Sequence, residues 1–356
     1  MRVVIIGAGV AGLGIGWRLL QQGCAVTILE RFQPGTGASW AAAGMLAVTA
    51  ELEDAAEPER ALAMRSSALW PGFAAELEEA SGRAVFLAED GALLLAGDAA
   101  GLEAMSGRAT GNLKLVGPEE ARALVPLLGP VAGGLWSPCE AHVDNRSLTE
   151  ALAIAVLKAG GVIQPNEPAV SIERKGGRSV AVLSPYGRYE GDAILVAAGA
   201  WSGLLDEIPI APVKGEVIAL APPPGAQLPG PVVWGESVYC VPRHGRLLVG
   251  ATMEEAGFDT MLTHAGRDRL RRAAETLMPS LKDWTLADHW AGLRPKSPDG
   301  LPLLGVLGDG LFVASGQYRN GILFTPAIAQ EMADIVLGKA DVLPDFDPSR
   351  FSGRFT

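Results

Sequence analysis

The chain has 356 residues, of which 49% are hydrophobic and 19% are charged. This length and composition predict a packed protein of one large domain or two closely joined domains, and they exclude a disordered chain. The formal net charge of −11 gives no electrostatic reason to bind nucleic acid or an anionic membrane. Because no apolar run reaches about 18 residues without glycine, proline or charge, we expect no transmembrane helix.

Cys24, Cys139 and Cys240 are widely spaced and odd in number, which favours buried thiols in a reducing compartment over a disulfide framework. The four histidines lack metal-ligand spacing, so we expect no metal site. We expect no cleavable secretory signal either, because its removal would take away the first strand. Together these features predict a cytoplasmic protein.

The first thirty residues predict a dinucleotide-binding βαβ unit. Gly7 would allow a tight turn, Gly9 would let a pyrophosphate approach the backbone, and Gly12 would let the helix pack on the sheet. Glu30 ends the second strand, where a carboxylate can accept hydrogen bonds from an adenosine ribose and would repel a 2′-phosphate. A purely structural glycine turn is the alternative, and the presence of both strands, the helix and the acid disfavours it. The expected strands are residues 3–6 and 25–29, and the helix runs to Gln22.

Two later segments are rich in small residues and suit close approach of the backbone to a ligand. Residues 40–45 read Trp-Ala-Ala-Ala-Gly-Met, which equally suits the start of an alanine-rich helix. The strand predicted at residues 189–198 runs into residues 199–203, Gly-Ala-Trp-Ser-Gly, which equally suits a tight turn.

The remaining chain alternates between helix and strand patterns. Pro71 predicts a break in a helix over residues 51–81. The other expected helices begin at Pro118 or span residues 145–159, 267–278 and 326–337. The other expected strands lie within residues 85–95, 162–163, 169–173, 179–183, 209–220, 238–242, 246–251, 284–293, 301–307 and 311–314.

This order predicts an α/β fold in which a discontinuous Rossmann-like nucleotide domain carries a β-rich substrate domain that is inserted twice, with ligands at the junction. We expect the nucleotide domain to comprise residues 1–84, 145–212 and 292–356. The substrate domain would comprise residues 85–144 and 213–291.

Over nearly its whole length the chain resembles the D-amino-acid oxidase family of flavoproteins, and within it the glycine oxidase branch that serves thiamine biosynthesis. The most specific similarities are residues 290–295, Trp-Ala-Gly-Leu-Arg-Pro, residues 297–300, and residues 318–323. The similarity is weaker over residues 97–117. The resemblance implies FAD, with the isoalloxazine at the domain boundary, and assembly as a homo-oligomer, often a tetramer.

The resemblance also implies that the FAD is held noncovalently. Some relatives attach flavin through cysteine or an N-terminal histidine, but this chain has no cysteine in residues 321–326 and no histidine before His142. Gln317 stands where relatives commonly carry histidine. The FAD-binding residues implied are Gly7, Gly9, Val10, Ala11, Gly12, Glu30, Arg31, Ala38, Ser39, Ala43, Gly44, Met45, Ala169, Gly199, Trp201, Gly316, Gln317, Tyr318, Arg319, Asn320, Gly321, Ile322 and Leu323.

At the substrate end, the resemblance favours Arg294 as a bidentate clamp for an amino-acid carboxylate, over a surface or interdomain salt bridge. Tyr239 would donate its hydroxyl to the same carboxylate, or else be an ordinary core tyrosine. Arg319 would lie near the flavin and the substrate amine. Met253 would form a pocket wall, with core packing an almost equal alternative.

The implied reaction is oxidative deamination of glycine, other small amines and D-amino acids, with O2 reduced to hydrogen peroxide, in support of thiazole synthesis. No side chain is expected to act as a catalytic acid or base, because positioning in a dry site suffices for hydride transfer. Rivals with the same fold are a D-amino acid dehydrogenase and a sarcosine or D-proline oxidase. A flavin-binding module without turnover is the rival from another class.

Overall fold

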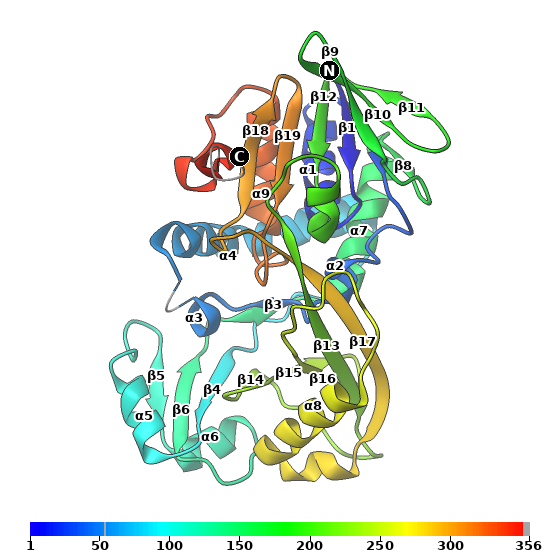
Figure 1. The fold of residues 1–356 in the computed structure, drawn as a ribbon. Coiled ribbons are helices and arrows are strands. Elements are labelled where there is room, and N and C mark those ends of the chain that lie inside the picture. The colour runs from blue at the N-terminus through cyan, green and yellow to red at the C-terminus, as the bar shows by residue number, and fades with distance from the viewer. Residues whose placement is uncertain (53–54, 352–356) are drawn as a thin grey trace.

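The computed structural model describes residues 1–52 and 55–351, and it is built around two sheets set end to end (Figure 1). The smaller sheet has the strand order β18-β19-β12-β1-β2-β8, parallel except for the antiparallel β18. Its strands are β1 (Arg2–Ile6), β2 (Ala25–Leu29), β8 (Val162–Gln164), β12 (Ala193–Val196), β18 (Leu303–Gly308) and β19 (Leu311–Ser315).

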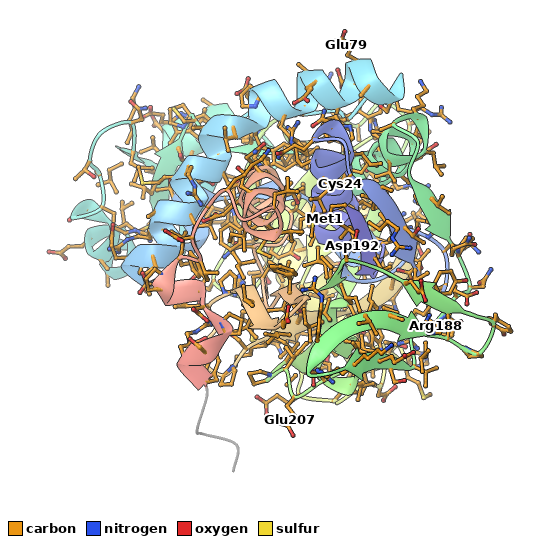
Figure 2. All side chains as sticks on the ribbon, turned by 90° about the horizontal axis from the view of Figure 1, so that it is seen from above. Met1, Cys24, Glu79, Arg188, Asp192 and Glu207 are labelled. Atoms are coloured by element: carbon orange, nitrogen blue, oxygen red, sulfur yellow. The ribbon has the colours of Figure 1, made fainter. Side chains whose placement is uncertain are left out.

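The smaller sheet is buried on both faces, which explains its continuous apolar strands. In β1, Val3 and Ile5 pack against helices, whereas Val4 and Ile6 pack toward a three-stranded sheet on the other face. Figure 2 accordingly shows Glu79, on α4 (Glu57–Ser81), above Met1, and Arg188, in the three-stranded sheet, below it. The helices are α1 (Val10–Gln21), α4 (Glu57–Ser81), α7 (Asn145–Lys158) and α9 (Thr325–Val336), and the three strands are β9 (Ser171–Lys175), β10 (Arg178–Leu183) and β11 (Arg188–Glu190).

The larger sheet has the order β17-β13-β16-β15-β14-β4-β6-β5. One face packs on an apolar cluster with α6 (Pro118–Leu124) and α8 (His264–Leu277), and the other faces the smaller sheet. The strands are β4 (Ala92–Ala96), β5 (Lys114–Val116), β6 (Gly133–Ser137), β13 (Ala211–Ala221), β14 (Val232–Trp234), β15 (Tyr239–Arg243), β16 (Arg246–Gly250) and β17 (Thr285–Lys296).

Short elements fill the junction and the periphery. Between the sheets lie α2 (Ala38–Ala41) and the strand pair of β3 (Met45–Leu46) and β7 (Ala141–His142). The others are the helices α3 (Val48–Glu51) and α5 (Ala99–Ser106) and the 3-10 turns Gly199–Leu204, Pro279–Asp283, Pro344–Phe346 and Pro348–Phe351. No helix in the described part of the chain combines the length and the hydropathy needed to cross a bilayer.

The predicted break at Pro71 is wrong, because α4 continues through it to Ser81. The helix is anchored on both sides of the proline: Trp70 is buried and donates its indole N–H to the Leu323 carbonyl at 3.0 Å, and Phe73 packs edge-on against Trp70. Tertiary packing therefore outweighs the loss of one helical hydrogen bond at an exposed position.

Two long strands cross the predicted domain boundaries. β13 begins at Ala211 and β17 ends at Lys296, and the two pair antiparallel from Ala211–Lys296 to Ala221–Thr285. The predicted boundaries after residues 212 and 291 thus fall inside continuous strands of the larger sheet. These strands carry the larger sheet up to the nucleotide domain (Figure 1).

Candidate active site

A cleft of about 1220 Å³ extends from the β1–α1 turn to the larger sheet. Its walls come from segments far apart in the chain, because the ends of β1, β2 and β12 in one sheet face β13, β15, β16 and β17 in the other. Such a junction of two domains is where ligand sites commonly lie.

The β1–α1 turn has the tight geometry that its glycines predict. Gly7 has φ +108°, and a Cβ there would lie 2.4 Å from the Ala197 carbonyl oxygen. A Cβ on Gly12 would lie 1.9 Å from the Gly7 oxygen, so this glycine permits the helix to pack on the turn. Gly9 is open toward the cleft except for the Ser39 hydroxyl, which accepts the Val10 N–H at 3.0 Å. Apart from the Val10 N–H, which Ser39 accepts, the N-terminus of α1 opens to the cleft, where its dipole favours an anion.

Glu30 lies at the end of β2 and lines the cleft, as the sequence predicts. Its carboxylate accepts the N–H of Ala8 at 2.8 Å and that of Phe32 at 3.0 Å, which fixes its place beside the turn. The adjacent Arg31 guanidinium stacks over Trp201 at 4.4 Å from the ring centroid. Both Arg31 and Trp201 are predicted cofactor residues, and here they meet at one wall.

Residues 39–44 are held from behind through their carbonyl groups. Asn145 donates to the carbonyls of Ser39 and Trp40, and Trp290 donates to that of Ala41. The neighbouring Arg243 donates to the Ala43 carbonyl at 2.6 Å. The Arg146 guanidinium lies 3.6 Å from the centroid of the Trp40 ring. The segment is therefore neither a plain alanine helix nor loose: α2 occupies only Ala38–Ala41, and the backbone then turns along the cleft.

The glycine loop after β19 closes the far end of the cleft. Tyr318 adopts φ +46° and donates its backbone N–H to the Pro295 carbonyl at 2.9 Å, which ties the loop to β17. Gln317 is buried, and its Nε2 has no hydrogen-bond partner within residues 1–52 and 55–351. A buried amide donor without a partner is costly unless a ligand satisfies it. The side chain present at this position therefore fits a bound polar cofactor.

Arg294 extends from β17 into the cleft and lies flat against β13. Its Nη1 donates to the carbonyls of Thr252 at 3.2 Å and Lys214 at 3.4 Å. A Cβ on Gly215 would lie 2.2 Å from Nη1, so only glycine leaves room for the guanidinium there. Among residues 1–52 and 55–351, no carboxylate lies within ion-pair distance of Arg294. The salt-bridge alternative therefore has no support among these residues.

Tyr239 lies on the same face of the larger sheet as Arg294. It pairs with Gly250, where a Cβ would lie 2.4 Å from the phenol oxygen, and its ring packs 5.3 Å from that of Trp234. Across the cleft mouth, the Tyr318 hydroxyl donates to the Met253 sulfur at 3.3 Å. Met253 is 54% exposed, so it is a wall residue and not part of the core.

The cleft brings together most of the residues predicted for cofactor and substrate, including Arg319, which is exposed at its rim. Three predicted residues lie behind the lining: Gly12 within α1, Gly316 at the end of β19, and the buried Leu323, whose carbonyl holds Ser66 and Trp70. The lining residues among the predicted set are Gly7, Gly9, Val10, Ala11, Glu30, Arg31, Ala38, Ser39, Ala43, Gly44, Met45, Ala169, Gly199, Trp201, Gln317, Tyr318, Arg319, Asn320, Gly321, Ile322, Arg294, Tyr239 and Met253.

Sequence reasoning missed several lining residues. Trp234, Thr252 and Phe258 carry no pattern beyond ordinary strand and loop composition, so no sequence feature marks them. Gly215 does carry a signal, because it stands inside the strand predicted at residues 209–220, and a glycine inside a strand often marks close approach by another group. In the described residues no cluster of three metal-ligating side chains occurs.

Comparison with known proteins agrees with this geometry. A family model described as FAD dependent oxidoreductase matches residues 2–335. The chain belongs to this family. The unpartnered Gln317 amide, the open glycine turn and the length of the cleft fit the FAD that these oxidoreductases use.

Within the FAD-dependent oxidoreductases, the chain is similar to glycine oxidases. It is 34% identical to the glycine oxidase of Pseudomonas aeruginosa, with 99% of this chain and 98% of that protein covered. The crystal structure of glycine oxidase from Geobacillus kaustophilus superposes with a TM-score of 0.91 at 33% identity, covering 98% of this chain and 99% of that one.

A second group of relatives is longer. The chain is 37% identical to the bifunctional protein ThiO/ThiG of Synechocystis sp. over 98% of its own length. It spans only 54% of that relative, so it matches about half of the bifunctional proteins and nearly all of the glycine oxidases.

His142 gives a testable consequence of the packing behind residues 43–45. It pairs with Met45 between β7 and β3, and burial, together with the positive charge of Arg243, lowers its pKa to about 4. In the unfolded chain the imidazole would titrate near 6.5. Between these values only the unfolded chain takes up the proton, so stability falls as the pH drops through this window.

We expect His142→Gln to remove this pH dependence. From pH 7.5 to pH 5.0 the free energy of unfolding of the wild type should fall by about 2 kcal/mol more than that of the variant. The reason is that a group protonated only when unfolded contributes about 1.4 kcal/mol per pH unit. Urea unfolding of both proteins at the two pH values measures it. Equal pH dependence in the two proteins would show that His142 titrates normally in the fold.

Proposed function

We propose that this protein is a glycine oxidase, which oxidises glycine and other small amines or D-amino acids to the imine with O2 as acceptor. The observation that carries the proposal is the Arg294 guanidinium, held open in the cleft against Gly215 without a carboxylate partner among the described residues. Similarity to proteins named glycine oxidase over nearly the whole chain supports the same activity.

Arg294 and Tyr239 would hold the substrate carboxylate. Both come from the cleft face of the larger sheet, and each lies against a glycine that leaves space for it, Gly215 and Gly250. A guanidinium offers two parallel N–H donors to a carboxylate, which fixes the orientation of the amino acid as well as binding it.

FAD held by the β1–α1 turn and by residues 317–322 would supply the acceptor for the hydride of the substrate Cα and the route for its electrons to O2, with hydrogen peroxide as the product. The residues of the chain would supply position and not proton transfer. Among the described residues that line the cleft, the carboxylates are Glu30, which is bound to the turn, and Glu236, which is exposed, and none is histidine, lysine or aspartate. The cleft thus offers no buried base near Arg294.

Four finer statements belong to the proposal. Residues 1–84, 145–212 and 292–356 would form the FAD domain, although β13 and β17 continue across its boundaries. Assembly as a homotetramer rests on the family resemblance, and a cytoplasmic location rests on the spacing and odd number of the cysteines. A role in thiazole synthesis is supported by the similarity to proteins named ThiO/ThiG.

Oxygen uptake with glycine, sarcosine, D-alanine and D-proline tests the activity. We expect turnover with glycine, release of hydrogen peroxide, and bleaching of the flavin by glycine without oxygen. Turnover only with a quinone or dye would make the protein a dehydrogenase. Failure of every amine to bleach the flavin would favour a binding module without turnover.

Arg294→Ala should raise the KM for glycine at least about 100-fold, because two charge-assisted hydrogen bonds to the carboxylate are lost. Arg294→Lys keeps the charge but not the paired donors, so its KM should lie between wild type and alanine. Visible absorbance checks that both variants keep FAD. Loss of FAD from Arg294→Ala would mean that the residue is structural.

Gly215→Ala should displace the Arg294 guanidinium, since the added Cβ would lie 2.2 Å from Nη1. We expect a KM at least about tenfold above wild type, with FAD retained, because a misplaced guanidinium loses hydrogen bonds to the carboxylate. Gly230→Ala, where a Cβ meets nothing within 4 Å, is the matched control and should leave KM unchanged. An unchanged KM in Gly215→Ala would contradict the placement of the clamp.

A further inference from the structure

The most deeply buried charges in the larger sheet lie directly behind the Arg294 site. Lys214 and Glu216 flank Gly215 on β13, so their side chains point to the opposite face from the guanidinium. Both are buried, with 2% and 0% of their side chains exposed, and Lys214 Nζ lies 3.0 Å from Glu216 Oε1. The proposed reaction uses neither group, and a buried ion pair is a poor source of stability.

Glu216 is the centre of a hydrogen-bond network. One carboxylate oxygen accepts from the backbone N–H of Thr263 at 3.2 Å and from its hydroxyl at 2.9 Å. The other lies 2.8 Å from His289 Nε2, on the neighbouring strand β17. Burial alone would favour the neutral acid, but the donors Lys214, Thr263 and His289 hold the pKa of Glu216 below its usual value.

Residues 214 and 216 hold the loop of residues 251–263 at both ends, through their backbone at its start and through their side chains at its end. At its start, the Thr252 hydroxyl accepts the Glu216 N–H at 2.9 Å, and Lys214 and Glu254 exchange backbone hydrogen bonds. Near its end, Lys214 Nζ donates to the Met261 carbonyl, next to the contacts that Thr263 makes with Glu216.

This loop faces the substrate end of the cleft. Met253, Phe258 and Thr260 line the cleft, and the Thr252 carbonyl accepts one of the hydrogen bonds that orient Arg294. Several apolar side chains of the loop are exposed and do not pack into a buried core, so the shape of the loop depends on the polar contacts at its ends. Met261 and Leu262 are among these exposed residues.

We propose that Glu216, together with Lys214, is a positioning residue that fixes the loop of residues 251–263 as the wall of the substrate site and thereby sets substrate affinity. This rests on the proposed function for its kinetic consequence, but the anchoring can be measured without turnover. The directional contacts of a charge pair specify one loop conformation, which apolar side chains of similar size would not do.

The double variant Lys214→Met/Glu216→Met separates positioning from folding, because replacing both charges by apolar groups is often neutral for stability. We expect a melting temperature close to wild type, retained FAD absorbance, and a KM for glycine raised about tenfold with kcat changed less, since the loss amounts to hydrogen bonds to charged groups. Hydrogen exchange of the amides at the end of the loop, above all that of Thr263, which donates to the Glu216 carboxylate, should be faster.

Glu255→Gln is the matched control, because this carboxylate is exposed in the same loop and makes no contact with Lys214 or Glu216 within the described residues. It should leave KM and exchange unchanged. If the double variant does not fold, Thr263→Val tests the same anchor with both charges in place. It should raise KM and exchange, and Thr263→Ser should restore both.

Unchanged KM and exchange in a folded double variant, or in Thr263→Val, would overturn the proposal and leave the pair a purely structural feature. Absence of glycine turnover in the wild type would instead overturn the proposed function, and the exchange measurement would still decide whether Glu216 anchors the loop.

Discussion

The pairing of β13 with β17 is the constraint on which the substrate end depends. Strand alternation gives β13 two different faces, one with Gly215 against the Arg294 guanidinium and one with Lys214 and Glu216 against the loop of residues 251–263. A shift of register by one residue would exchange these faces, which would bury a charged side chain under the guanidinium and leave the loop without its anchor. The position of the Arg294 guanidinium and the contacts of β13 with the loop are therefore set by one strand pairing.

At the end of the cleft near the β1–α1 turn, the lining is shaped mainly by the backbone and its hydrogen bonds. The start of α1 lines the cleft, while the carbonyls of Ser39, Trp40, Ala41 and Ala43 accept hydrogen bonds from Asn145, Trp290 and Arg243. A segment whose acceptors are already occupied cannot swing toward the protein interior, so it keeps its small side chains along the cleft. These hydrogen bonds fix the backbone of residues 39–43 at one wall of the cleft.

Sequence reasoning located the features that have local causes. The βαβ unit, the helix of α7 and the glycine loop after β19 follow from periodicity and turn residues, and the family match agrees with the fold and the cofactor. The exceptions have long-range causes. Pro71 is tolerated because Leu323 and Phe73 anchor the neighbouring Trp70, and neither β13 nor β17 ends at a boundary that composition would mark. The short elements α5 and β5 lie where the family similarity is weak.

The carbonyls of residues 39–43 also bear on the order in which the chain acquires structure. The donor on Asn145 is 105 residues downstream of Trp40, that on Arg243 is 200 residues downstream of Ala43, and that on Trp290 is 249 residues downstream of Ala41. At a synthesis rate of about 5–20 residues per second, Trp290 leaves the ribosome ~10–50 s after Ala41, whose carbonyl it binds. The β1–α1 turn is synthesised first, but residues 39–43 acquire all of these hydrogen bonds only after Trp290 has been synthesised.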